Sequence, residues 1–193
     1  MRKLICLCLL LLALPPNSLA QEETYEQLVK RYDYDRSTPL DLRDFGVVRR
    51  EEGVRVHDIS YASLKGGRVP AYLVVPEGKG PFAAILFGHW AMKGSPTRNR
   101  TEFLDEAVAL ARAGAISLLP DAPFARHGFK ETTQPFDPRD IETYFQQVLD
   151  MRRGIDLLVA REDVDPARLA YVGHSYNANV GGVLAGVEKR IKT

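Results

Sequence analysis

The sequence predicts an α/β fold in which a mostly parallel sheet carries helices on both of its faces. Short apolar runs alternate with longer amphipathic stretches from residue 82 onward, and Gly or Pro separates most of them. Strands that alternate with helices pair in parallel, because each right-handed crossover returns the chain to the same edge of the sheet. Two further β-prone runs precede this part, and we expect them to form an antiparallel hairpin.

The first twenty residues have the layout of a secretory signal peptide. Arg2 and Lys3 precede an apolar run from Leu4 to Leu14, and Ser18-Leu19-Ala20 has small residues at the positions that determine cleavage. A run of this length is too short to span a bilayer, which needs ~20 residues. We therefore expect cleavage after Ala20, a secreted or periplasmic location, and no stable membrane insertion of the mature chain.

Composition and charge exclude several classes of protein. The chain is 45% hydrophobic and 26% charged, as is usual for globular domains. Its 26 basic and 25 acidic side chains give no basic surface for nucleic acid. Cys6 and Cys8 leave with the signal peptide, so the mature chain has no disulfide and no thiol nucleophile. No residues have metal-ligand spacing, and we expect neither a metal nor a cofactor.

Residues 21–53 are expected to form a leader segment, and residues 54–193 the domain itself. Apolar residues at helical spacing predict a helix within residues 21–45. From Val54 on, the β-prone runs 54–62 and 68–75 flank Lys65-Gly66-Gly67, which predicts the hairpin.

Three apolar runs predict buried parallel strands, at residues 82–87, 115–119 and 169–172. We expect Thr101 to cap a helix that ends at Gly114, where a left-handed residue is favoured. Asp137-Pro138 predicts the start of a long helix that reaches Val159. A helix of small residues follows the last strand.

The motif that carries chemistry is Gly173-His174-Ser175-Tyr176-Asn177, between the third buried strand and this helix. A serine in a tight strand-to-helix turn is the arrangement of a nucleophile elbow, which lifts the hydroxyl above the sheet. Asn177 stands where the Gly-x-Ser-x-Gly pattern has glycine, and we attribute this to the tolerance of asparagine for unusual backbone angles.

With this motif the chain resembles the α/β-hydrolase superfamily over roughly residues 54–193, especially its dienelactone-hydrolase-like and prolyl-oligopeptidase-like members. The resemblance rests on the elbow and on four further segments: Val75-Pro76, Phe87-Gly88-His89-Trp90, Leu119-Pro120-Asp121 and residues 164–170. It implies a hydrolase of small-molecule carboxylic esters that forms an acyl-enzyme on Ser175. Dienelactone hydrolases proper use a cysteine nucleophile, so the serine branch fits better.

The resemblance also implies an oxyanion hole. One donor would be the backbone N–H of Tyr176, and the other that of Trp90 or Ala91. Each such donor is typically worth ~10²–10³ in rate.

None of the four histidines is expected to be the catalytic base. His89 and His174 are interpreted as packing residues, His127 as an exposed loop residue, and His57 lies in the hairpin, far from the elbow.

The triad of this superfamily runs Ser, then Asp or Glu, then His along the chain. Residues 176–193 contain neither Asp nor His, and residues 190–193 are interpreted as the start of another strand. We therefore expect an incomplete domain whose C-terminal strands are missing and whose activity is accordingly low. The strand 169–172 would then be an exposed apolar edge.

Two other functions stay open. One is a serine peptidase of the prolyl-oligopeptidase type, although residues 21–53 are too short for the usual propeller. The other is a non-catalytic binding domain with the same fold. The sequence carries no signal for substrate identity or oligomeric state.

Overall fold

The structure is a computed structural model that describes residues 23–132 and 137–193. The predicted signal peptide lies outside these ranges. None of the helices within them has the length and apolar character that crossing a membrane requires.

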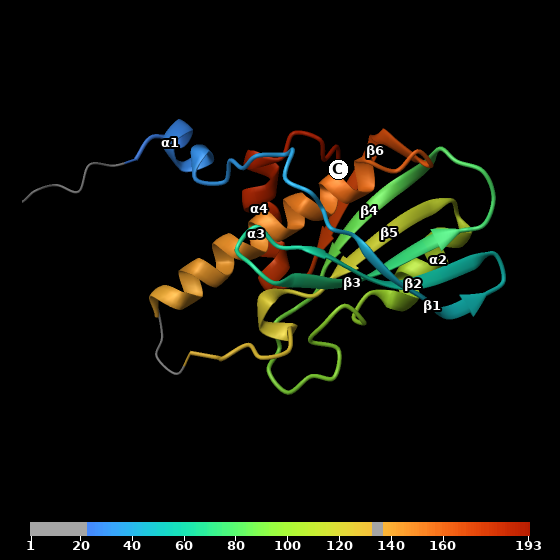
Figure 1. Ribbon diagram of the computed structural model, residues 1–193, viewed down its shortest axis with the longest axis horizontal. Helices are drawn as coiled ribbons and strands as arrows, with labels where there is room; N and C mark the ends of the chain where they lie inside the picture. The colour runs from blue at the N-terminus through green and yellow to red at the C-terminus, as the bar shows by residue number, and fades with distance from the viewer. Residues whose placement is uncertain (1–22, 133–136) are drawn as a thin grey trace, which may run out of the picture.

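A six-stranded sheet with the order β1-β2-β3-β5-β4-β6 forms the centre of the molecule (Figure 1). Antiparallel pairs join β1 to β2, β2 to β3 and β3 to β5. The strand β4 lies parallel to both of its neighbours, β5 and β6. The bounds are β1 Arg43–Glu51, β2 Val54–Ala62, β3 Arg68–Pro76, β4 Phe82–Gly88, β5 Ala115–Pro120 and β6 Val164–Gly173.

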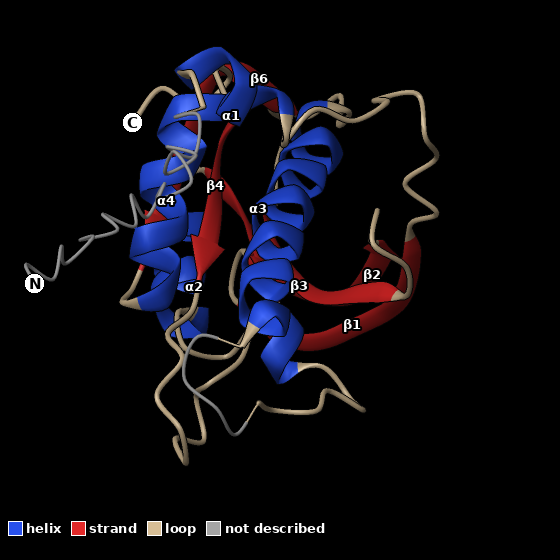
Figure 2. Ribbon diagram, turned by 90° about the vertical axis from the view of Figure 1, so that its left-hand side faces the viewer, coloured by secondary structure: helices blue, strands red, loops and turns tan. Residues whose placement is uncertain are grey.

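Helices cover both faces of this sheet. On one face α3 and α4 lie side by side (Figure 2), and their apolar residues join the larger core cluster with Ile59, Leu86 and Leu169. On the other face α2 packs against Val74 and Leu119. The helix bounds are α1 Tyr25–Lys30, α2 Leu104–Arg112, the 3₁₀ turn η1 Pro123–Ala125, α3 Pro138–Val159 and α4 Tyr176–Val187.

The structure confirms the predicted hairpin as β2 and β3, and the three predicted parallel strands as β4, β5 and β6. The burial predicted for the third of them is wrong beyond Leu169, because β6 is only partly covered. Gly114 has a φ of 89° after α2, as predicted for a helix C-terminus. The start of α3 is also confirmed, because the Asp137 side chain accepts a hydrogen bond from the Arg139 N–H at 2.9 Å and Pro138 occupies the first turn.

Two further local expectations are wrong. Thr101 does not cap α2; its hydroxyl donates to Asn99 at 2.7 Å, and the N-cap residue is Phe103. The leader segment is helical only in α1, and residues 43–51 form the unpredicted strand β1. This strand is largely exposed and rich in charge, so it lacks the apolar alternation by which strands are recognised. The sheet therefore begins N-terminal of residue 54.

The strand β6 lies at the edge of the sheet, as expected. Leu169 is buried under the helices, but Val172 is 38% exposed. The last residues run beside β6, since the Lys192 N–H donates to Leu169 at 2.8 Å and Thr193 accepts from the Tyr171 N–H at 2.9 Å.

A group of buried and half-buried charged side chains connects the segment after α1 to the C-terminal end of α3, which we call its far end. We call it the arginine cluster, and it consists of Arg152, Arg153, Asp156, Glu188 and Arg190. Arg153 and Arg190 contact Asp156 at 2.8 and 2.7 Å. Arg152 donates to the Tyr32 carbonyl and Arg153 donates to the Thr38 carbonyl at 2.7 Å.

Candidate active site

The turn predicted to be a nucleophile elbow lies between β6 and α4 and has a strained backbone at its centre. Ser175 lies between β6 and α4 and has φ 52° and ψ −108°, a conformation that non-glycine residues rarely adopt. Two backbone hydrogen bonds hold the turn, from His174 N–H to the Gly88 carbonyl at 3.0 Å and from Asn177 N–H to the His174 carbonyl at 3.1 Å. Backbone strain of this kind gathers at functional sites.

Two glycines make the turn possible. A Cβ atom at Gly173 would lie 2.4 Å from the backbone oxygen of Asn177, and one at Gly88 would lie 2.6 Å from the Cβ of Asn177. Both distances are far inside van der Waals contact. The ends of β4 and β6 can therefore approach the first turn of α4 only because neither position carries a side chain.

Asn177 is present for a different reason from the predicted one. It lies within α4 and has no positive φ, so the interpretation by unusual backbone angles is wrong. Its buried side chain instead donates to the His89 carbonyl at 2.6 Å and accepts from Gln147 at 2.8 Å. Asn177 thus ties α4 to the loop after β4 and to α3.

The three predicted oxyanion donors lie in different environments. Within the described residues, the N–H groups of Tyr176 and Ala91 make no hydrogen bond. The Trp90 N–H, in contrast, donates to the Glu102 carboxylate at 2.5 Å.

The histidines are engaged elsewhere. The pKa of buried His89 is lowered to about 4 by its burial, so the ring is neutral at pH 7. Its Nδ1 donates to the Trp90 carbonyl at 2.8 Å and its Nε2 accepts from the Ala122 N–H at 2.9 Å. His127 is exposed, and His57 pairs with Asp44 at 2.9 Å.

Glu102 is a site residue that the sequence analysis missed. One carboxylate oxygen contacts His174 Nδ1 at 2.6 Å, while the other accepts from the Trp90 N–H. The His174 ring stacks on the indole of Trp90, with ring centroids 5.2 Å apart. No linear motif marks this contact, because the three residues come from different parts of the chain.

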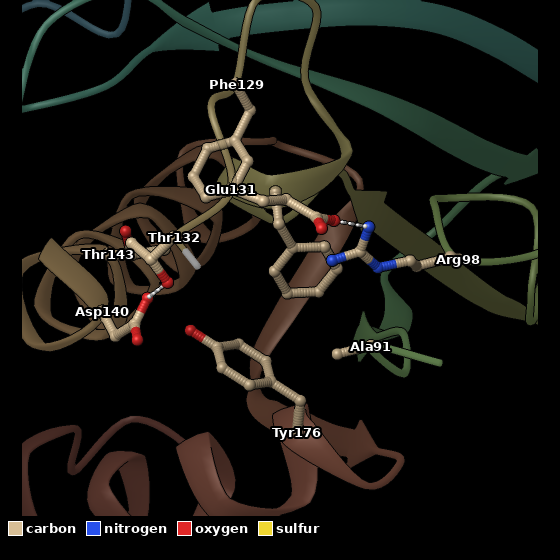
Figure 3. Close-up of a pocket in the computed structure, with 9 residues that line it drawn as sticks. Ala91, Arg98, Phe129, Glu131, Thr132, Asp140, Thr143 and Tyr176 are labelled. Atoms are coloured by element: carbon tan, nitrogen blue, oxygen red, sulfur yellow. Dashed lines mark hydrogen bonds and ion pairs between the residues drawn. The ribbon is translucent and has the colours of Figure 1, made fainter. Parts of the chain in front are cut away.

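A pocket of about 270 Å³ opens beside the elbow (Figure 3). The Arg98 guanidinium donates to Glu131 at 2.6 Å and lies over the ring of Phe124. The Tyr176 hydroxyl points into the pocket and has no hydrogen-bond partner within the described residues, and burial raises its pKa. The lining residues are Ala91, Arg98, Phe124, Phe129, Glu131, Thr132, Asp140, Thr143 and Tyr176.

Residues 23–132 and 137–193 contain no group of three His, Cys, Asp or Glu side chains that could hold a metal ion. The chemistry that this arrangement offers is a serine hydroxyl at a helix N-terminus, with free backbone N–H groups and a pocket next to it.

No protein-family model and no curated protein matches the sequence. Solved structures do match. An acetyl xylan esterase from Paenibacillus sp. R4 is 21% identical with a TM-score of 0.63, and the alignment covers 87% of this chain and 55% of that one. Acetyl xylan esterase 1 from Thermoanaerobacterium sp. is 15% identical with a TM-score of 0.69, and 87% and 56% of the two chains are covered.

A glucuronoyl esterase from Solibacter usitatus is 14% identical with a TM-score of 0.59, and 86% and 55% of the two chains are covered. This chain thus spans about half the length of these structures. Together with the strand order, the likeness shows that the chain has the α/β-hydrolase fold.

Proposed function

We propose that the protein is a serine hydrolase of carboxylic esters, with Ser175 as its nucleophile. The observation that carries this proposal is the strained backbone of Ser175 at the junction of β6 and α4. A strained serine in this turn favours a catalytic role over that of a non-catalytic binding domain, because the strain lifts the hydroxyl to the position of a nucleophile. The esterases with the same fold support the reaction class.

In the proposed reaction, Ser175 Oγ attacks the acyl carbon of the ester and forms a C–O bond. The carbonyl oxygen becomes an oxyanion that accepts hydrogen bonds from the N–H groups of Tyr176 and Ala91, since Glu102 occupies that of Trp90. The bond to the leaving alkoxide then breaks, and the proton that Ser175 Oγ gives up passes to that oxygen to form the free alcohol. In a second step water attacks the acyl carbon, which releases the carboxylic acid and returns a proton to Ser175 Oγ. The positive end of the α4 dipole favours the developing negative charge.

We propose that the pocket beside Tyr176 receives one side of the ester. Arg98 forms an ion pair with Glu131, and the carboxylate of Asp140 accepts a hydrogen bond from the Thr132 hydroxyl at 2.7 Å. An uncharged group with aromatic contacts to Phe124 and Phe129 fits this lining.

Proton transfer is the slow part of this scheme. Within the described residues no histidine is hydrogen-bonded to Ser175, and residues 176–193 supply neither His nor Asp. Binding and oxyanion stabilisation without a triad base give only ~10³–10⁴ over the reaction in water. We therefore propose that residues 21–193 alone turn esters over slowly and in a manner that depends on Ser175. The basic start and the apolar run of residues 4–14 support export of the protein.

The test is covalent labelling of the exported protein with a fluorophosphonate, followed by mass spectrometry. We expect one adduct on Ser175 and an N-terminus at Gln21. The Ser175→Ala variant should not be labelled, and it should lose the residual turnover of p-nitrophenyl acetate.

The matched control is Ser37→Ala, which removes a serine that is exposed but has ordinary backbone angles. This variant should be labelled like the wild type. Labelling that survives in Ser175→Ala, or that is equal in folded and urea-unfolded protein, contradicts the proposal.

A further inference from the structure

Glu102 contacts both segments that would form the oxyanion hole. Its carboxylate accepts from the Trp90 N–H at 2.5 Å, and Ala91 is the next residue. It also contacts His174 Nδ1 at 2.6 Å, and Ser175 is the next residue there. One buried side chain thus connects the loop after β4 with the elbow.

Successive residues of the loop after β4 are hydrogen-bonded to other segments of the chain. The Gly88 carbonyl accepts from the His174 N–H, and the His89 carbonyl accepts from Asn177. At Trp90, the backbone N–H contacts another segment through Glu102. This N–H belongs to the His89–Trp90 peptide, whereas the Ala91 N–H belongs to the next peptide plane, whose Trp90 carbonyl accepts from His89 Nδ1 at 2.8 Å. Glu102 therefore fixes the position of the loop, and His89 fixes the direction of the Ala91 N–H.

The burial of Glu102 shows that this contact is specific. Its side chain is only 11% exposed, and a carboxylate out of water needs partners that compensate for lost hydration. A carboxylate close to an oxyanion hole also opposes the negative charge that develops there. Such a group is tolerated only where its two contacts stabilise the arrangement around it.

We propose that Glu102 is a positioning residue that sets the spacing between the N–H groups of Ala91 and Tyr176; this inference rests on the function proposed above. Glu102 does not touch the substrate. It holds the Trp90 peptide against His174, and the stacked rings of Trp90 and His174 support the same spacing.

The test compares Glu102→Ala with Glu102→Gln. Alanine removes both contacts and displaces a donor without deleting it. We therefore expect the maximal rate of Ser175 phosphonylation to fall ~10- to 100-fold, at most the lower end of what the loss of one oxyanion donor costs, with unchanged affinity for the probe. Glutamine can still accept from the Trp90 N–H and donate to an unprotonated His174 Nδ1, so it should restore the rate to within about threefold, since both hydrogen bonds are kept. Glu106→Ala, an exposed change on α2, is the matched control and should have no effect.

Amide hydrogen exchange gives a second readout that does not depend on labelling. The Trp90 amide should exchange faster in Glu102→Ala than in the wild type, and circular dichroism verifies that the variant is folded. Absence of any labelling in the wild type would contradict the proposed function. The exchange rate of the Trp90 amide would still test whether Glu102 holds the Trp90 N–H. The positioning role is overturned if Glu102→Ala is folded but leaves the phosphonylation rate or the Trp90 exchange unchanged, or if Glu102→Gln is as slow as Glu102→Ala.

Discussion

The buried polar side chains next to the two ends of α3 differ in how they are paired. At its far end, Asp156 accepts from Arg153, Arg190 and the Tyr34 hydroxyl, all at 2.7–2.8 Å. At its first turns, next to the elbow, the Tyr176 hydroxyl is buried without a partner within the described residues. An unpaired buried hydroxyl costs about 1–3 kcal/mol.

In the arginine cluster the protein itself supplies partners for the charged groups, and of these side chains only the Arg153 Nε atom is buried without a partner within the described residues. Beside the elbow, the hydroxyl of Tyr176 and the N–H groups of Ala91 and Tyr176 have no partner in the part of the chain that the structure describes. This is the difference expected between a polar region that supports the fold and one that binds a ligand. The following variants test this contrast.

The largest effect is expected for Asp156→Ala. Removing this carboxylate leaves Arg153, which is 1% exposed, without its ionic partner, and breaking a buried pair typically costs about 3–5 kcal/mol. The free energy of unfolding from urea titration measures the loss. The control is Asp105→Ala, because Asp105 is 84% exposed and an exposed pair contributes about 0–1 kcal/mol. Equal losses in both variants would refute the structural role of the cluster.

A smaller effect is expected at the elbow for Gly173→Ala. The new Cβ would overlap with the Asn177 backbone, and such overpacking costs about 1–3 kcal/mol. Gly182→Ala is the matched control, since its Cβ would meet no atom within 4 Å and alanine favours a helix interior by about 0.5–1 kcal/mol. The two variants should therefore shift the melting temperature in opposite directions, and shifts of the same sign would argue against a sterically closed turn.

The smallest effect is expected for Tyr176→Phe. Deleting an unpaired hydroxyl removes no hydrogen bond and relieves its burial cost, so the free energy of unfolding should rise by about 1 kcal/mol, the low end of that cost. Tyr34→Phe makes the same chemical change in the arginine cluster, where burial and the bond to Asp156 raise the pKa of Tyr34 to about 12. That variant should lose about 1.5–3 kcal/mol. A larger loss in Tyr176→Phe than in Tyr34→Phe would reverse the contrast.

Local patterns predicted most of the central sheet and the strand-to-helix turn at Ser175, but not the contacts that surround this turn. The segments that form β4 and β5 are apolar because helices cover both faces of the sheet there, and Ser175 stands in a motif with fixed spacing. The edge strand β1 was not predicted because an exposed strand needs no apolar alternation. The contacts of Glu102 and Asn177 were not predicted because their partners lie far away in sequence, and only the packed structure brings them together.

The contacts of the N-terminal segment also have a consequence for the order of assembly. The Tyr25 hydroxyl bonds Gly186 across 161 positions of sequence, and Tyr34 bonds Asp156 across 122. These partners leave the ribosome long after the segment itself, and closing such distant contacts is slow. Residues 25–34 are made early and therefore dock among the last. Until both α3 and α4 are in place, this segment lacks the partners that hold it against the rest of the domain.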